Sequence, residues 1–174
     1  LRAITLGSKF VLIFYLAKVL QPEDIGIYGL TVVTVNFCMY VVGLDFYVYS
    51  QREILSGADA NRATLVRDQL VFYSIWYLVV LPVIFSIFFV GLMPLEMWKW
   101  FYVLLVLEHI SHEGYRLLIV IHRPILAGWA LFLRSGAWVY AVLMIMLLEP
   151  VARDLSLVWL GWAVGATGSI VLVF

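Results

Sequence analysis

The sequence predicts an all-α integral membrane protein with six transmembrane helices. Hydrophobic residues make up 65% of the 174 positions and charged residues only 13%. Soluble domains contain roughly 45–50% hydrophobic and about 25% charged residues. The apolar residues are collected into stretches of about twenty, the length that crosses a hydrocarbon layer of roughly 30 Å as a helix. Composition and segment length together place the chain in a membrane.

Six such stretches follow one another along the chain. Most are separated by short connections that contain a proline, such as Pro22, Pro94 and Pro124, and proline continues a helix only at the loss of a hydrogen bond. We therefore expect neighbouring spans to form antiparallel hairpins. The predicted spans are residues 3–20, 25–44, 70–92, 98–121, 125–148 and 155–174.

The connection between the second and third spans, residues 49–69, is longer and predicts a short amphipathic segment with Asp59 as a helix N-cap. Basic residues at the predicted span ends are more numerous on this side, which by the positive-inside rule places the N-terminus in the cytoplasm. They are Arg2, Arg52, Arg62, Arg67 and Arg123, against Lys18, Lys99 and Arg153 on the other side. The first and last spans have no polar flank, so both chain ends look cut.

The fourth span differs from the others because it carries five ionisable residues near its middle. At roughly 100° per residue, these positions fall within an arc of about 140° on one face of a helix. Ionisable side chains inside a membrane usually line a cavity or a path rather than face lipid. This face, formed by Glu108, His109, His112, Glu113 and Arg116, therefore predicts a polar interior.

Antiparallel pairing of the fourth and fifth spans brings another cation to this depth. A hairpin joined near Arg123 places Arg134 level with His112. Each unpaired charge at the centre of a bilayer costs about 2.5–3.5 kcal/mol on insertion scales. We therefore expect Arg134 to form a buried ion pair with Glu108 or Glu113.

The first hairpin adds a third interior cation by the same reasoning. If the first two spans are joined near Pro22, Lys9 lies level with Asn36 close to the bilayer midplane. The same register pairs Arg2 with Asp45 at the membrane surface, where a solvated salt bridge is the expected outcome.

Two interpretations of these interior residues are open from the sequence. In the functional one, Lys9, Arg116 and Arg134 bind an anionic group, and the two glutamates and two histidines carry protons or a coupling cation. In the structural one, the glutamates offset the arginines, and the histidines supply hydrogen bonds. A metal site is less favoured, because residues 108–113 match neither the H-E-x-x-H and H-x-x-E-H patterns nor Glu-x-x-His.

Other function classes find little support. The formal net charge is zero and basic residues form no tract, so nucleic-acid binding is not expected. No nucleophile elbow, phosphate-binding loop or dinucleotide-binding loop is found, and we expect no cofactor. The single cysteine, Cys38, is interpreted as an apolar core thiol. Gly161 and Gly165 have the G-x-x-x-G spacing, which we interpret as ordinary close helix packing.

Two parts of the chain resemble polysaccharide flippases, the O-antigen and lipid-linked oligosaccharide exporters of the multidrug/oligosaccharidyl-lipid/polysaccharide superfamily. Residues 16–29, with the sequence LAKVLQPEDIGIYG, followed by an apolar helix and Gly43-Leu44, resemble the family's opening, with Lys18 at a usual arginine and Ile25 at a usual aromatic position. The segments EGYR at 113–116 and FLRSG at 132–136 resemble its fourth and fifth helices.

The resemblance implies that the chain is the N-terminal lobe of a two-lobe transporter whose second lobe is absent from this chain. It implies a multi-pass protein of the bacterial inner membrane, not an enzyme, that moves a lipid-linked diphosphate oligosaccharide outward by alternating access driven by protons or sodium. Lys9, Arg116, Arg134 and Asn36 would contact the head group, and Glu108, His109, His112 and Glu113 would couple transport to the ion. A drug/cation antiporter of the same superfamily is the first alternative, and a membrane-embedded transferase or a structural subunit is less favoured.

Overall fold

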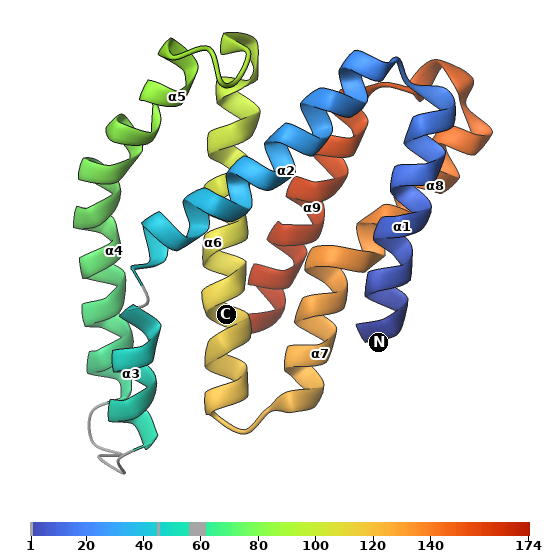
Figure 1. Cartoon of the computed structure of the whole chain (residues 1–174). Coiled ribbons are helices and arrows are strands. Elements are labelled where there is room, and N and C mark those ends of the chain that lie inside the picture. Colours follow the sequence, from blue (N-terminus) through green and yellow to red (C-terminus); the bar gives the residue numbers. More distant parts are fainter. Residues whose placement is uncertain (1, 45, 56–61) are drawn as a thin grey trace.

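The computed structural model describes residues 2–44, 46–55 and 62–174, and this part of the chain is helical without any strand (Figure 1). Asp45 and Asp59, to which the predicted surface pair and N-cap belong, lie outside the described residues. The main helices are α1 (Arg2–Val19), α2 (Pro22–Gly43), α3 (Phe46–Leu55), α4 (Arg62–Ile84), α6 (Trp98–Val120), α7 (Pro124–Phe132), α8 (Trp138–Leu148) and α9 (Leu155–Val173). Shorter elements are α5 (Ser86–Phe89), η2 (Leu95–Met97), η3 (Leu133–Ala137) and η4 (Pro150–Ala152).

Four helical segments of the described residues are long and apolar enough to cross a membrane. They are Pro22–Gly43, Thr64–Phe89, Pro124–Leu148 and Leu155–Val173. The other two predicted spans also form helices, α1 and α6, but ionisable side chains interrupt their apolar sequence. The all-α prediction is therefore confirmed, and membrane crossing is supported for four of the six predicted spans.

The surface supports a membrane environment independently. Large apolar side chains are exposed along the outer sides of the helices, including Phe14, Leu78 and Phe89, each at least 75% exposed. Soluble monomers rarely expose contiguous apolar patches of more than a few hundred Å². These exposed apolar side chains and the four long apolar helices together indicate a membrane-embedded chain.

The helix ends follow the sequence closely at the prolines. Pro22 and Pro124 both occupy the first turn of their helices, where the missing N–H costs nothing. The predicted third span begins eight residues too late, because α4 already starts at Arg62. Residues 62–69 include Arg62, Arg67, Asp68 and Gln69, which lower the hydropathy of this segment without ending the helix.

The helices are arranged around α6 and α9, which pack side by side (Figure 1). The pair α3 and α4 lies on one side, and α1 lies with α7 and α8 on the other. Helix α2 crosses obliquely and contacts both α6 and α4. Its C-terminal end is fixed by the Trp76 indole, which donates to the carbonyl oxygen of Val41 at 3.2 Å.

The predicted close packing at Gly161 and Gly165 is confirmed. A Cβ atom at Gly165 would lie 2.4 Å from Cδ1 of Trp138 and 2.8 Å from the carbonyl oxygen of Leu133, and one at Gly161 would lie 2.4 Å from Cγ2 of Val142. These distances are shorter than van der Waals contact. Helix α9 therefore approaches η3 and α8 as closely as two backbones allow.

Candidate functional site

A polar cavity of about 200 Å³, which we call the central cavity, lies where α1, α2, α6 and η3 meet. Seven of the eight residues predicted from the sequence line it, and only Glu113 does not. Its lining residues are Lys9, Asn36, Met39, Tyr40, Gly43, Glu108, His109, His112, Arg116 and Arg134.

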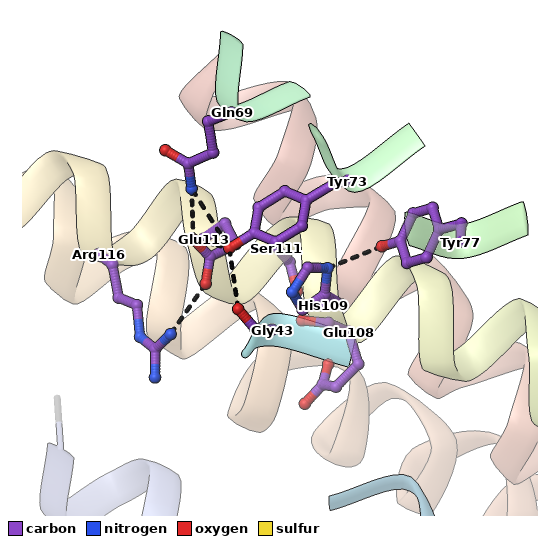
Figure 2. Close-up of polar contacts among 9 residues, drawn as sticks. All are labelled: Gly43, Gln69, Tyr73, Tyr77, Glu108, His109, Ser111, Glu113 and Arg116. Atoms are coloured by element: carbon purple, nitrogen blue, oxygen red, sulfur yellow. Dashed lines mark hydrogen bonds and ion pairs between the residues drawn. The ribbon is translucent and has the colours of Figure 1, made fainter. Parts of the chain in front are cut away.

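The positions of the α6 residues around the helix explain this arrangement. Glu108 and His112 lie at one edge of the polar arc and face α1, α2 and η3, and Glu113 lies about 140° away from Glu108. An arc this wide faces two different neighbours. The expectation that all five side chains share one cavity is wrong at Glu113, which points toward α4 instead (Figure 2).

The predicted ion pair of Arg134 is formed with Glu108. Nε of Arg134 lies 3.7 Å from Oε1 of Glu108, and the two side chains are only 11% and 8% exposed. This distance is too long for a hydrogen bond. Nε and Nη1 of Arg134 and Oε2 of Glu108 are all buried without a hydrogen-bond partner among the described residues. The pair is therefore balanced in charge but leaves hydrogen-bonding capacity unused.

Arg134 projects from a local irregularity of its helix. Residues Leu133–Ala137 form a single π-helical turn between α7 and α8, an element that is frequent at functional sites. The indole of Trp138 donates to the carbonyl oxygen of Arg134 at 3.0 Å. Trp138 itself is packed against the glycine face of α9, so the backbone that carries Arg134 is held from two sides.

Lys9 and Asn36 form the open side of the cavity. Both side chains are exposed, and no ion pair or hydrogen bond involves the Lys9 ammonium within the described part of the chain. The Asn36 amide donates from Nδ2 to the carbonyl oxygen of Val32 at 2.8 Å. The amide oxygen of Asn36 therefore remains as an acceptor beside the cation of Lys9.

Glu113 is held in a separate polar cluster between α4 and α6. Its carboxylate accepts hydrogen bonds from Nε2 of Gln69 at 2.8 Å, the hydroxyl of Tyr73 at 3.2 Å and Nη1 of Arg116 at 2.8 Å (Figure 2). The Arg116 guanidinium also lies 3.5 Å from the ring centroid of Tyr47, a cation–π contact with α3. The cluster thus joins α3, α4 and α6 through one carboxylate.

His109 lies between this cluster and the central cavity. Its Nδ1 is 2.7 Å from the hydroxyl of Tyr77, and the rings of Tyr73 and Tyr77 stand edge-on to the imidazole. Nε2 of His109 has no partner among the described residues and lies beside Gly43. The neighbouring His112 is half-buried and stacks on Tyr115 at a centroid distance of 6.3 Å.

Comparison with known proteins adds no assignment. No family model, curated protein or solved structure matches the chain. Within the described residues, no three histidine, cysteine, aspartate or glutamate side chains are grouped as a metal ion would require.

The sequence analysis did not identify the partners that α4 supplies. Gln69, Tyr73 and Tyr77 are spaced four residues apart, which places them in one row on a helix. This row of polar side chains on a largely apolar helix is the sequence pattern that indicates partners for the polar face of α6. Tyr47 had no comparable signal, because its contact with Arg116 depends on how α3 folds back against α6.

A second cavity, of about 270 Å³, adjoins the central cavity on the side of α1 and α2. Lys9, Asn36, Glu108 and Arg134 line both. The remaining lining includes the aromatic side chains of Tyr28, Trp138 and Trp162. We call it the aromatic cavity.

Proposed function

We propose that the protein moves an anionic, lipid-linked saccharide across the membrane, as one lobe of an alternating-access transporter. The substrate would carry a phosphate or diphosphate between its lipid and its sugar. The observation that carries this proposal is the charge of the central cavity. Arg116 is neutralised by Glu113, whereas Lys9 and Arg134 share the single carboxylate of Glu108, so the cavity holds an excess of positive charge.

The unused hydrogen bonds of Arg134 support binding of an anion. A buried donor without a partner costs about 1–3 kcal/mol, and two such donor nitrogens, Nε and Nη1, occur on the Arg134 guanidinium. Phosphate oxygens satisfy guanidinium donors in pairs, by charge-assisted hydrogen bonds that are stronger than neutral ones. An anion bound between Lys9 and Arg134 would supply the missing partners.

The aromatic cavity supports a saccharide next to that anion. Tyr28 stacks on Trp159, and Trp138 stacks on Trp162 with nearly parallel rings. Such rings offer flat apolar surfaces, and the N–H of indole and O–H of tyrosine add polar edges. The amide oxygen of Asn36, which lines both cavities, lies where a sugar hydroxyl would donate.

A drug/cation antiporter is the alternative that this geometry favours less. A cationic substrate would have to enter a cavity in which Lys9 and Arg134 outnumber the carboxylate. A membrane-embedded transferase also fits less well, because the carboxylate nearest the cavity, Glu108, is paired with Arg134 rather than free to act as a general base.

Reconstitution tests the proposal. The purified protein is incorporated into liposomes with a fluorescent lipid-linked saccharide diphosphate, and outward movement is followed with a membrane-impermeant quencher. We expect wild type to move this lipid, and Arg134→Gln and Lys9→Gln to lose most of the rate. Arg67→Gln, which removes a cation from an exposed pair, is the matched control and should keep the rate.

The same liposomes distinguish the alternatives. An analogue that lacks the diphosphate should move poorly in wild type. If the protein instead exports cationic dyes and leaves the anionic lipid in place, the flippase proposal is wrong and the antiporter is the better assignment.

A further inference from the structure

A third cavity, a pocket of about 170 Å³, lies between α4 and α6 on the far side of His109. We call it the α4–α6 pocket, and its polar lining residues are Gln69, Tyr73, Ser74, Tyr77, His109 and Glu113. Among the described residues, His109 is the only one that lines both this pocket and the central cavity. Its imidazole is therefore the contact between the central cavity and the α4–α6 pocket, which α6 otherwise separates.

The two ring nitrogens of His109 face these two spaces. Nδ1 is hydrogen-bonded to the hydroxyl of Tyr77 at 2.7 Å, and Tyr77 lines the α4–α6 pocket. Nε2 lies on the side of Gly43, which lines the central cavity, and a Cβ atom at position 43 would be 3.4 Å from it. The residue is only 2% exposed and Nε2 has no partner in the described part of the chain. Figure 2 shows His109 between Tyr77 and Gly43.

We propose that the coupling ion of the transporter is the proton, and that His109 and Tyr77 pass it between the central cavity and the α4–α6 pocket. This inference rests on the proposed function and names the ion that drives it. An imidazole suits the role because it accepts a proton at one nitrogen and releases one from the other.

A proton that enters from the central cavity is transferred through His109 and then through Tyr77. The proton adds to the lone pair of Nε2, giving an imidazolium whose Nδ1–H donates to the oxygen of Tyr77. The Nδ1 proton then passes to that oxygen while the original hydroxyl proton of Tyr77 passes to water in the α4–α6 pocket. One proton has moved, and both side chains end neutral. The imidazole now carries its hydrogen on Nε2; with the ring turned to one side of the path during the conformational cycle, loss of the Nε2 proton to water and gain of a proton at Nδ1 from the same side restore the starting tautomer without reversing the transfer.

Charged and titratable groups on five helical elements surround His109 and influence whether its imidazole is protonated. Glu108 directly precedes His109 in the sequence. Burial and the cation of Arg116 disfavour a long-lived imidazolium at His109. An anion bound in the central cavity would offset positive charge there and favour protonation, which links substrate binding to proton uptake. The groups are Lys9 on α1, Tyr40 on α2, Tyr73 and Tyr77 on α4, Glu108, His112, Glu113 and Arg116 on α6, and Arg134 in η3.

Two conservative variants test the path. Tyr77→Phe removes the hydroxyl but keeps the ring that packs on His109, and His109→Gln keeps a polar side chain that cannot titrate. Tyr102→Phe is the matched control, since the Tyr102 hydroxyl also joins α6 to α4, by donating to the carbonyl oxygen of Leu81 at 2.7 Å outside both cavities. Thermal unfolding in detergent confirms that each variant folds.

The assay measures two quantities in the same liposomes: movement of the fluorescent lipid-linked saccharide diphosphate, and proton flux with an internal pH-sensitive dye. We expect Tyr77→Phe and His109→Gln to lose about a hundredfold in substrate-dependent proton flux, the scale on which a positioned proton donor acts, while lipid still equilibrates down its own gradient. Tyr102→Phe should retain both.

The outcomes separate the two proposals. If wild type moves the lipid but the Tyr77→Phe and His109→Gln variants keep wild-type proton flux, the proton path is wrong and the flippase proposal stands. The same holds if wild type moves the lipid without any proton flux. If wild type does not move the anionic lipid at all, both proposals are overturned.

Discussion

Nε of Arg134 and Oε1 of Glu108 lie 3.7 Å apart inside the helix bundle, close enough to attract and too far apart to share a hydrogen bond. The two side chains come from different helical segments, Arg134 from η3 and Glu108 from α6, and both are almost fully buried. At this distance no third group fits between the two atoms, but Nε and Nη1 of Arg134 remain buried without a hydrogen-bond partner among the described residues. Because Arg134 lines the central cavity, we interpret these donors as the place where an anion is received.

Substitutions at Glu108 and Arg134 should have non-additive effects on the free energy of unfolding. We expect Glu108→Gln and Arg134→Gln each to destabilise the protein by about 1–3 kcal/mol, because each leaves a buried partner unsatisfied. The double variant should cost less than the sum of the two, since no uncompensated charge remains. Denaturant titration in mixed micelles measures the four free energies of unfolding.

The exposed pair of Arg67 and Asp68 serves as the comparison. Their side chains are 71% and 57% exposed at 3.0 Å separation, so we expect a coupling of less than about 1 kcal/mol. If the buried pair shows no larger coupling than this surface pair, Glu108 and Arg134 do not interact as described.

Close packing of α9 makes a sharp prediction about two glycines on that helix. Gly165→Ala should destabilise the protein by about 1–3 kcal/mol, because its Cβ would meet Trp138 and the backbone oxygen of Leu133. Gly168→Ala is the matched control, as no atom lies within 4 Å of the added Cβ. Equal thermal stability of the two variants would contradict the packing of α9 against η3.

The Glu113 cluster should act as a structural joint rather than as part of the substrate site. Glu113→Ala removes the acceptor of three hydrogen bonds, two of which join α4 to α6, and we expect a loss of about 2–4 kcal/mol, from one buried carboxylate and its unpaired arginine. Glu113→Gln keeps an acceptor oxygen and should lose less. Pulsed hydrogen exchange should show α3 and the start of α4 opening first in the alanine variant.

The predicted orientation is tested with single cysteines. Cys38 is buried, and its replacement by alanine removes any background labelling. Glu23→Cys, in the first turn of α2, should react with an impermeant maleimide from outside the cell, and Arg123→Cys, in the turn before α7, only after the membrane is opened. Both positions are exposed. Labelling of both from the same side would rule out the hairpin arrangement.

Much of the fold could be predicted, because prolines and apolar run lengths act locally. The prolines at positions 22 and 124 start helices as expected. Helix α6 begins at the predicted residue, Trp98, and ends at Val120, one residue before the predicted end. The start of α4 was missed because polar residues near a membrane surface lower the hydropathy without stopping a helix. The π-helical turn at Arg134 has no local signal, since it depends on the packing of Trp138 against Gly165.

Helix register and side-chain direction were not equally predictable from the sequence. Hairpin register placed Lys9 level with Asn36 and Arg134 level with His112, and all four line the central cavity. It could not decide which neighbour faces each edge of the α6 arc, and therefore placed Glu113 with Glu108. The direction of a side chain around a helix depends on crossing angles between helices, which this sequence pattern does not encode.

The central claim is that the central cavity is wet and positively charged, and the rate of thiol modification at its open side tests it most directly. In a Cys38→Ala background, Asn36→Cys is treated with an anionic and a cationic methanethiosulfonate reagent of similar size. The account predicts that the anionic reagent reacts faster, and that the lipid-linked saccharide diphosphate slows it. Absence of reaction with either reagent, or faster reaction with the cationic one, would contradict the account.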